Sequence, residues 1–274
     1  MLRAESRLPR AEYSTPVRVQ ELFDLAGKVA IVTGGATGLG RQMADALAEC
    51  GADVVVCARN VERCERAATE LESLGVRALG LGCDVRDPDS IAHVVDSTVQ
   101  RLGRVDVLLN NAGTSWAASP EEIPVEAWHK VIDVNLTGAF LFAQHVGRVL
   151  IAQGEGGKIV NVASVAAFRG APPEIMDALP YNASKGGLVA LTIDLAVKWA
   201  RHDIQVNAIA PGWFPSDMSE KVLARSGDAL LSRVPLGRFG RPDDIKGVAA
   251  FLASRASDFV TGTTLFVDGG QSAG

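Results

Sequence analysis

Tyr181 and Lys185 are the pair of residues whose types and spacing most directly suggest chemistry. They lie four positions apart in a segment with helical period, so both side chains lie on one face of a helix. A free tyrosine has a pKa near ~10, which is too high for efficient acid–base work at neutral pH. A nearby ammonium group lowers that pKa, so Tyr181 is a candidate general acid or base. Because two positions can match by chance, the interpretation needs support from the rest of the chain.

A glycine-rich string between a β-rich run and a helical segment suggests a second kind of chemistry. It reads Thr33-Gly34-Gly35-Ala36-Thr37-Gly38-Leu39-Gly40. Glycines permit a tight turn and a close approach of the backbone to a phosphate. The start of the helix then offers unpaired N–H groups and the positive end of its dipole. In this context the string predicts a dinucleotide-binding turn rather than an ordinary surface loop.

The end of the next β-rich run indicates which dinucleotide would bind. It reads Val56-Cys57-Ala58-Arg59-Asn60 and contains no acidic residue. A carboxylate at this place would bind the ribose 2′-hydroxyl of NAD, whereas an arginine can pair with the 2′-phosphate of NADP. Arg59 therefore favours NADP(H), with NAD(H) as the weaker alternative. The other interpretation of Arg59 is a solvated surface residue.

The elements that must position these residues alternate along the chain from Lys28 onward. The β-rich runs are Val29–Thr33, Asp53–Cys57, Ala78–Cys83, Val105–Leu109, Lys158–Val162, Ile204–Ile209 and Thr264–Val267. The helical segments are Leu39–Glu49, Val61–Leu74, Ser90–Leu102, Val125–Ile151, Asn182–Ala200 and Asp243–Ala253. Alternation predicts parallel strands with right-handed crossovers, and the continuously apolar runs predict helices on both faces. We therefore expect an α/β fold, a single doubly wound Rossmann-type domain with a parallel sheet of about seven strands.

Length fits one domain better than two. At about 150 residues per domain, 274 residues would allow two, but single α/β domains reach about 250. No linker divides the chain after residue 27. We expect residues 25–274 to form the dinucleotide-binding and catalytic domain. Residues 1–24 have no apolar period, and we expect a flexible N-terminal extension there.

Composition excludes several classes of function. Hydrophobic residues make up 47% of the chain, and the net charge of -5 is spread without long basic runs, which argues against nucleic-acid binding. No apolar stretch approaches the ~20 residues of a membrane span. The four cysteines form no CxxC pair and the four histidines no HxxxH motif, so we expect buried thiols, a reducing cytoplasmic location and no metal site.

The motifs taken together resemble the short-chain dehydrogenase/reductase family over about residues 25–270. Those that carry the resemblance are Thr33, Gly34, Gly38 and Gly40 (TGxxxGxG), Asn110-Asn111-Ala112-Gly113, Asn135, Ser164, Tyr181 with Lys185 (YxxxK), Pro211-Gly212 and Val267-Asp268-Gly269-Gly270. Two loops, residues 110–116 and 210–218, are similar to those of 3-oxoacyl reductases of the rhamnolipid-pathway type and of gluconate 5-dehydrogenases. Those two groups act on different substrates.

The resemblance implies a role for each of four residues. Tyr181 protonates the carbonyl oxygen as hydride arrives, and Ser164 donates a hydrogen bond to the same oxygen. Lys185 also binds the nicotinamide ribose, and its ammonium group together with the positive charge of an oxidised nicotinamide lowers the pKa of Tyr181. Asn135 holds a water that connects Lys185 to solvent, the alternative being an ordinary helix residue.

The resemblance also implies the binding positions. For the cofactor these are Gly34, Ala36, Thr37, Gly38, Leu39, Gly40, Arg59, Asp84, Val85, Asn111, Ala112, Gly113, Tyr181, Lys185, Pro211, Gly212, Phe214 and Ser216. The substrate pocket would include Ser115, Trp116, Val165, Met176 and Trp213.

Two departures from the family pattern affect these expectations. The interval between Ser164 and Tyr181 is longer than usual, with a proline-rich apolar insertion at residues 171–180 that we expect to line the substrate pocket. Ser115 and Ser184 are rival hydroxyls for the role of Ser164. After Pro211-Gly212, Phe214 and Ser216 stand where the family commonly has isoleucine and threonine, which keeps one apolar side chain and one hydroxyl.

The large apolar side chains at the pocket favour an apolar ketone, such as a 3-oxoacyl substrate. A sugar acid of the gluconate type is the alternative, and Arg169 is the residue that could pair with its carboxylate. A silent cofactor-sensing regulator would be expected to lose Tyr181 or Lys185, and an epimerase or dehydratase of the extended branch has a differently spaced glycine motif. We therefore expect an NADP(H)-dependent carbonyl reductase, reversible as an alcohol dehydrogenase. By the same resemblance we expect a homotetramer or homodimer.

Overall fold

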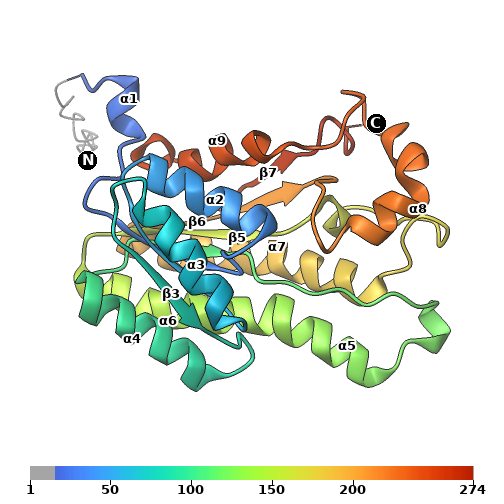
Figure 1. Cartoon of the computed structure of the whole chain (residues 1–274), viewed down its shortest axis with the longest axis horizontal. Coiled ribbons are helices and arrows are strands. Elements are labelled where there is room, and N and C mark those ends of the chain that lie inside the picture. The colour runs from blue at the N-terminus through green and yellow to red at the C-terminus, as the bar shows by residue number, and fades with distance from the viewer. Residues whose placement is uncertain (1–15, 274) are drawn as a thin grey trace, which may run out of the picture.

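The computed structural model describes residues 16–273 of the 274-residue chain (Figure 1). Expectations that concern residues 1–15, including most of the N-terminal extension, lie outside the described residues. Within the rest of the extension, residues 16–24, the chain forms the short helix α1 (Val19–Leu22), and Leu25 is already buried.

Seven parallel strands form one sheet in the order β3-β2-β1-β4-β5-β6-β7. The strands are β1 (Val29–Thr33), β2 (Asp53–Ala58), β3 (Ala78–Gly82), β4 (Val107–Asn110), β5 (Gly157–Val162), β6 (Ile204–Pro211) and β7 (Thr264–Val267). The predicted doubly wound Rossmann-type fold is confirmed. β1 pairs with β2 on one side and β4 on the other, so the strand order reverses at β1. Ligands of such sheets bind at the carboxyl ends of the strands beside this reversal.

Helices cover both faces of the sheet (Figure 1). One layer consists of α2 (Gly38–Glu49), α3 (Val61–Glu72) and α9 (Pro242–Ala253), and the other of α4 (Pro88–Leu102), α6 (Gly138–Gln153) and α7 (Leu179–Trp199). Successive strand residues point to opposite faces. In β1, Ala30 and Val32 join the core under the first layer, whereas Val29 and Ile31 join the core under the second. This double burial explains why the runs in the sequence are continuously apolar.

The predicted long helix over residues 125–151 is wrong in one respect, because it is interrupted. α5 (Val125–Ile132) passes into a π-helical segment at Asp133–Thr137, and α6 follows. Such π-bulges are frequent at functional sites, and this one carries Asn135. A further helix, α8 (Glu220–Leu231), was not predicted and lies between β6 and α9 in the chain. None of the helices in residues 16–273 is long and apolar enough to cross a membrane.

Candidate active site

A cavity of about 850 Å³ lies at the carboxyl ends of the strands. Its volume is in the usual range for ligand sites of ~300–1,000 Å³. Every residue predicted to contact the cofactor lines this cavity, as do Ser164, Tyr181 and Lys185. The sheet thus brings together predicted residues from distant parts of the sequence, from Gly34 to Ser216.

The glycine-rich turn connects β1 to α2 and forms one end of the cavity. Helix α2 begins at Gly38, and the Thr37 side chain does not cap it, so the first N–H groups of α2 have no side-chain partner. The Asn111 side chain donates to Thr33 O (3.0 Å) and Gly34 O (3.2 Å), which fixes the turn against β4. A Cβ at Gly40 would lie 2.3 Å from Gly34 O, so only glycine fits. The turn therefore presents free N–H groups at a helix start, which suits a pyrophosphate.

Two exposed arginines, Arg59 and Arg63, line the cavity where β2 ends and α3 begins. Arg59 was predicted as a phosphate partner, whereas Arg63 was missed, although a spacing of four residues across a strand–helix turn is a visible signal. Asp84 lies at the same end and pairs with Arg86 at 2.5 Å. Hydrogen bonds from Arg86 hold the pKa of Asp84 at about 2. The negative charge of Asp84 is therefore neutralised by Arg86. The side chains of Arg59 and Arg63 remain available to bind an anion.

Lys185 is buried at the centre of the cavity, with 4% of its surface exposed. Its Nζ donates to Val162 O at the end of β5 (2.6 Å) and lies 5.6 Å from the centroid of the Tyr181 ring. Burial without an acidic partner lowers the pKa of Lys185 to about 8. The ammonium group can therefore lose and regain its proton near neutral pH.

Tyr181 lies one turn before Lys185 on α7 and is partly exposed to the cavity. Burial raises the pKa of its phenol, and a hydrogen bond with the Ser164 hydroxyl lowers it by less. The prediction was that the Lys185 ammonium group and the positive charge of an oxidised nicotinamide together lower the phenol pKa, whereas in the protein without ligand this pKa is raised. The physical reason is that desolvation outweighs an ammonium group that points at the Val162 carbonyl instead. Any further lowering needs a positive charge from a bound ligand.

Asn135 does not line the cavity but lies directly behind it. Its Oδ1 accepts from Thr114 N (2.8 Å), and its Nδ2 donates to Thr114 O (2.9 Å) and to Ser184 Oγ (2.9 Å). These bonds tie the π-helical segment to the loop after β4 and to α7. Ser184, one of the rival hydroxyls, is thus used in this network and is fully buried.

Of the residues predicted for the substrate pocket, all but one line the cavity. Ser115, Val165, Met176 and Trp213 line the cavity, and Met176 belongs to the predicted insertion. Trp116 does not line it and is 42% exposed. Ile175, also from the insertion, lines the cavity as well. The missed lining residues include Leu230, Arg225 and Arg233 in and just after α8, and Gln271 near the C-terminus. The sequence pattern did not predict that α8 and the C-terminal residues line the cavity, because irregular loops determine where both segments lie.

Residues 34–272 match the family model described as enoyl-(acyl carrier protein) reductase. A gluconate 5-dehydrogenase of Burkholderia cenocepacia, crystallised with NADP and tartrate, superposes with a TM-score of 0.89 at 38% identity over 94% of this chain and all of that one. The chain belongs to the short-chain dehydrogenase/reductase family.

Relatives within the short-chain dehydrogenase/reductase family have different named substrates. A 2-dehydro-3-deoxy-D-gluconate 5-dehydrogenase of Dickeya dadantii is 41% identical over 251 residues, which are 90% of this chain and 96% of that protein. A 3-oxoacyl-[acyl-carrier-protein] reductase of Thermotoga maritima is 39% identical over 246 residues, which are 90% of this chain and 98% of that protein. As a member of this family the chain is an oxidoreductase of the kind that acts on CH–OH groups. The predicted family and reaction class are confirmed.

Proposed function

We propose that the protein interconverts a ketone and a secondary alcohol with NADP(H), and that Tyr181 is its acid and base. The observation that carries this proposal is that Ser164, Tyr181 and Lys185 line the same cavity as the glycine-rich turn. NADPH, when bound, supplies the hydride and becomes a cation next to the phenol.

The proton on the Tyr181 phenol passes to the substrate oxygen as the carbonyl carbon accepts hydride. Ser164 lies beside Tyr181, and its hydroxyl donates to the same oxygen, which stabilises the negative charge that develops there. In the opposite direction Tyr181 accepts the alcohol proton. Both groups are fixed by secondary structure, Ser164 at the end of β5 and Tyr181 in α7.

Lys185 returns the proton to Tyr181. Its pKa of about 8 allows the exchange near neutral pH. A Cβ at Gly113 would lie 3.8 Å from Lys185 Nζ and 3.5 Å from Asn135 Oδ1, so both groups lie next to Gly113, Lys185 in the cavity wall and Asn135 behind it. This proximity supports a path from Lys185 past Asn135 for the incoming proton.

Arg59 and Arg63 support NADP(H) over NAD(H) as the cofactor. Both line the cavity beyond the end of β2, where no carboxylate occupies the strand end. Two guanidinium groups suit a phosphate dianion. The Burkholderia cenocepacia relative was crystallised with NADP, which agrees with this choice.

Two substrate classes are candidates. The apolar wall of Ile175, Met176 and Trp213 supports a 3-oxoacyl or other apolar ketone. Arg169 and Gln271 in the same wall, together with relatives named for gluconate derivatives, support a sugar acid or another small acid.

The test is turnover of a ketone panel with the purified protein. NADPH with deuterium at both C4 positions should transfer a deuteride to the carbonyl carbon of at least one 3-oxoacyl thioester, keto sugar acid or simple ketone, detected by mass spectrometry of the alcohol. NADPH consumption without deuterated alcohol, or no consumption with any ketone, contradicts the proposed reaction.

Exposed apolar residues support assembly into a homodimer or homotetramer. Ile193 and Val197 on α7 are 50% and 77% exposed, and Phe266 on the edge strand β7 is 44% exposed. Light scattering after gel filtration should give a mass above 28.8 kDa, and a monomer at micromolar concentration contradicts this expectation.

A further inference from the structure

The chain after β7 folds into a short, well-fixed turn beside the substrate half of the cavity. The Asp268 carboxylate accepts from Gly270 N (2.9 Å) and Ser272 N (2.7 Å) and also binds the Ser272 hydroxyl. The turn packs on the loop after β6, where Gly212 N donates to Val267 O (3.0 Å) and a Cβ at Gly212 would lie 2.8 Å from the Asp268 Cβ. These contacts fix the position of the next residue in the turn, Gln271.

Gln271 connects three parts of the wall. Its side chain is 3% exposed, and its Oε1 accepts from Trp213 Nε1 (3.2 Å) and from an Nη2–H of Arg169. Its backbone oxygen accepts from Arg169 Nη1 at 2.6 Å. Arg169 follows β5 and Trp213 follows β6, so one buried amide orients side chains from two loops. The bidentate contact holds the guanidinium group in one place at the cavity.

The charge of Arg169 has no acidic partner among residues 16–273. Its two contacts with Gln271 go to neutral oxygens, and no described carboxylate lies within 4.0 Å. A guanidinium group has five N–H donors, so three remain after these two bonds. The group is partly buried and lines a cavity beside the apolar Met176, where an unpaired charge is costly. An anion in the cavity would remove that cost.

The position of Arg169 relative to the reacting oxygen limits the size of the anion. Ser164 caps the 3₁₀ turn η3 (Val165–Ala167), and Arg169 follows two residues after its end. A 3₁₀ turn rises about 2 Å per residue, so its three residues cover about 6 Å, and the two residues that follow add at most about 7 Å. The long side chain of Arg169 covers part of that distance. A carboxylate a few bonds from the carbonyl fits this gap, whereas the phosphates of a thioester carrier lie many bonds away.

We propose that Arg169, held by Gln271, binds the carboxylate of a small keto or hydroxy acid and is the residue that selects the substrate. The inference rests on the reaction proposed above. Arg169 touches the substrate, and Gln271 is a positioning residue.

The test compares short keto acids with their methyl esters, using acetoacetate, levulinate and 5-oxohexanoate. The native protein should prefer the acid at least tenfold in kcat/KM, mainly through KM. Arg169→Met should raise KM for the acid by about 10–100-fold, which corresponds to the loss of about 1.5–3 kcal/mol from charged hydrogen bonds, and leave the ester unchanged. Gln271→Glu keeps the contacts but supplies Arg169 with a carboxylate, so it should also remove the preference. Arg101→Met, at an exposed position outside the cavity, is the matched control.

Equal kcat/KM for acid and ester in the native protein, or parallel losses for both in Arg169→Met, overturns the assignment. Succinate binding in the presence of NADP⁺ gives a readout that needs no turnover. It should weaken at least tenfold in Arg169→Met and Gln271→Glu but not in Arg101→Met. If no ketone is reduced, the proposed function fails while succinate still decides the role of Arg169. If the esters are reduced and succinate binds all variants equally, Arg169 alone is wrong.

Discussion

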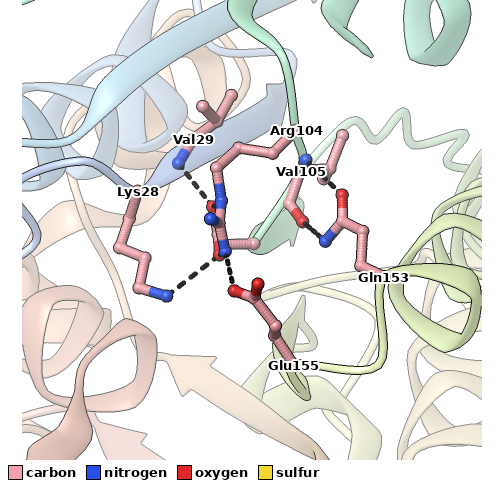
Figure 2. A network of polar contacts seen from close by, with 7 residues as sticks. Lys28, Val29, Arg104, Val105, Gln153 and Glu155 are labelled. Atoms are coloured by element: carbon pink, nitrogen blue, oxygen red, sulfur yellow. Dashed lines mark hydrogen bonds and ion pairs between the residues drawn. The ribbon is translucent and has the colours of Figure 1, made fainter.

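The amino-terminal and carboxyl-terminal edges of the sheet differ in whether their charged side chains have partners of opposite charge. At the amino-terminal edge, Asp106 precedes β4 and accepts from Val29 N (2.9 Å), from Lys28 Nζ (3.1 Å) and from Arg104 through two nitrogens (Figure 2). Arg104 also pairs with Glu155 at 2.7 Å. Every charge in this cluster has a partner of opposite sign.

Neighbouring polar side chains at the amino-terminal edge also have hydrogen-bond or ion-pair partners within the protein. The Gln153 amide accepts from Val105 N (3.0 Å) and donates to Val105 O (2.7 Å). Lys158, near the start of β5, is 7% exposed and pairs with Asp258 at 2.7 Å. Polar groups at this edge therefore join strands and helices to one another.

At the carboxyl-terminal edge, most of the cations that line the cavity lack a carboxylate within 4.0 Å among the described residues. They include Lys185, Arg169 and Arg59. An unpaired cation in a cleft destabilises the free protein but binds anionic ligands. The amino-terminal edge therefore serves stability, whereas the carboxyl-terminal edge presents charges that a bound anion would neutralise.

The largest expected effect is on turnover at the carboxyl-terminal edge. Tyr181→Phe removes only the phenol oxygen, so the proposed proton transfer stops while the ring still fills its space. We expect kcat to fall by about 10³–10⁴-fold, the upper part of the range for general acid–base catalysis. The dissociation constant for NADPH, measured by fluorescence, and the melting temperature should stay within error of the native protein. Undiminished turnover contradicts the role of Tyr181.

The second effect is on stability at the amino-terminal edge. Burial raises the pKa of Asp106, but hydrogen bonds from Arg104, Val29 and Lys28 together lower it below its ordinary value. Its stabilisation is therefore present above the unfolded pKa of about 3.9 and is lost as pH falls through the lower folded pKa. Asp106→Asn should reduce the free energy of unfolding at pH 7 by about 1–3 kcal/mol, because it leaves Lys28 without its partner and Arg104 with Glu155 alone.

Urea unfolding at pH 7 and at pH 3 measures this effect, and the difference between the native protein and Asp106→Asn should shrink at pH 3. Lys198→Ala removes an exposed pair with Asp194 on α7 and should change stability by less than about 0.5 kcal/mol. A large loss of kcat per folded molecule in Asp106→Asn would show that the two edges are not separate in function.

The contrast between the edges also explains how much the sequence could predict. The strands were predictable because both faces of each are buried, so their apolar runs are continuous. The π-helical break at Asn135 was not, since residues 133–137 keep a helical period. The break accompanies contacts with Thr114 and Ser184, which only the folded chain brings together. Gln271 was missed for the same reason, because its partners follow other strands.

The third prediction concerns cofactor choice. Arg59→Asp replaces a cation that lines the cavity beyond β2 by a carboxylate that would repel a 2′-phosphate and accept from a 2′-hydroxyl. The ratio of kcat/KM for NADPH over NADH should fall by about 10–100-fold or more, which corresponds to about 1.4–2.8 kcal/mol. Arg63→Gln should shift the ratio in the same direction by less. Equal ratios in the native protein and in Arg59→Asp contradict the assignment.

The smallest expected effect is on the free energy of unfolding, and it differs between two buried lysines near opposite ends of β5, Lys185 and Lys158. The folded pKa of Lys185 is about 8, below the unfolded value of about 10.4, so its charged form destabilises the free protein fully below pH 8. That cost disappears as pH rises from about 8 to 10.4. Lys185→Met should therefore stabilise the cofactor-free protein at pH 7 by about 1 kcal/mol, since the gain in desolvation exceeds the lost bond to Val162.

The same free energies of unfolding, measured at pH 7 and pH 10, should show this gain vanish at the higher pH. Lys158→Met is the matched change at the amino-terminal edge and should bring no gain at pH 7, because the charge of Lys158 is offset by Asp258. A gain in both variants would mean that burial alone governs the two sites. A loss in Lys185→Met would mean that its bond to the Val162 carbonyl outweighs desolvation, and the two edges would then differ in ligand binding but not in the stability of their charges.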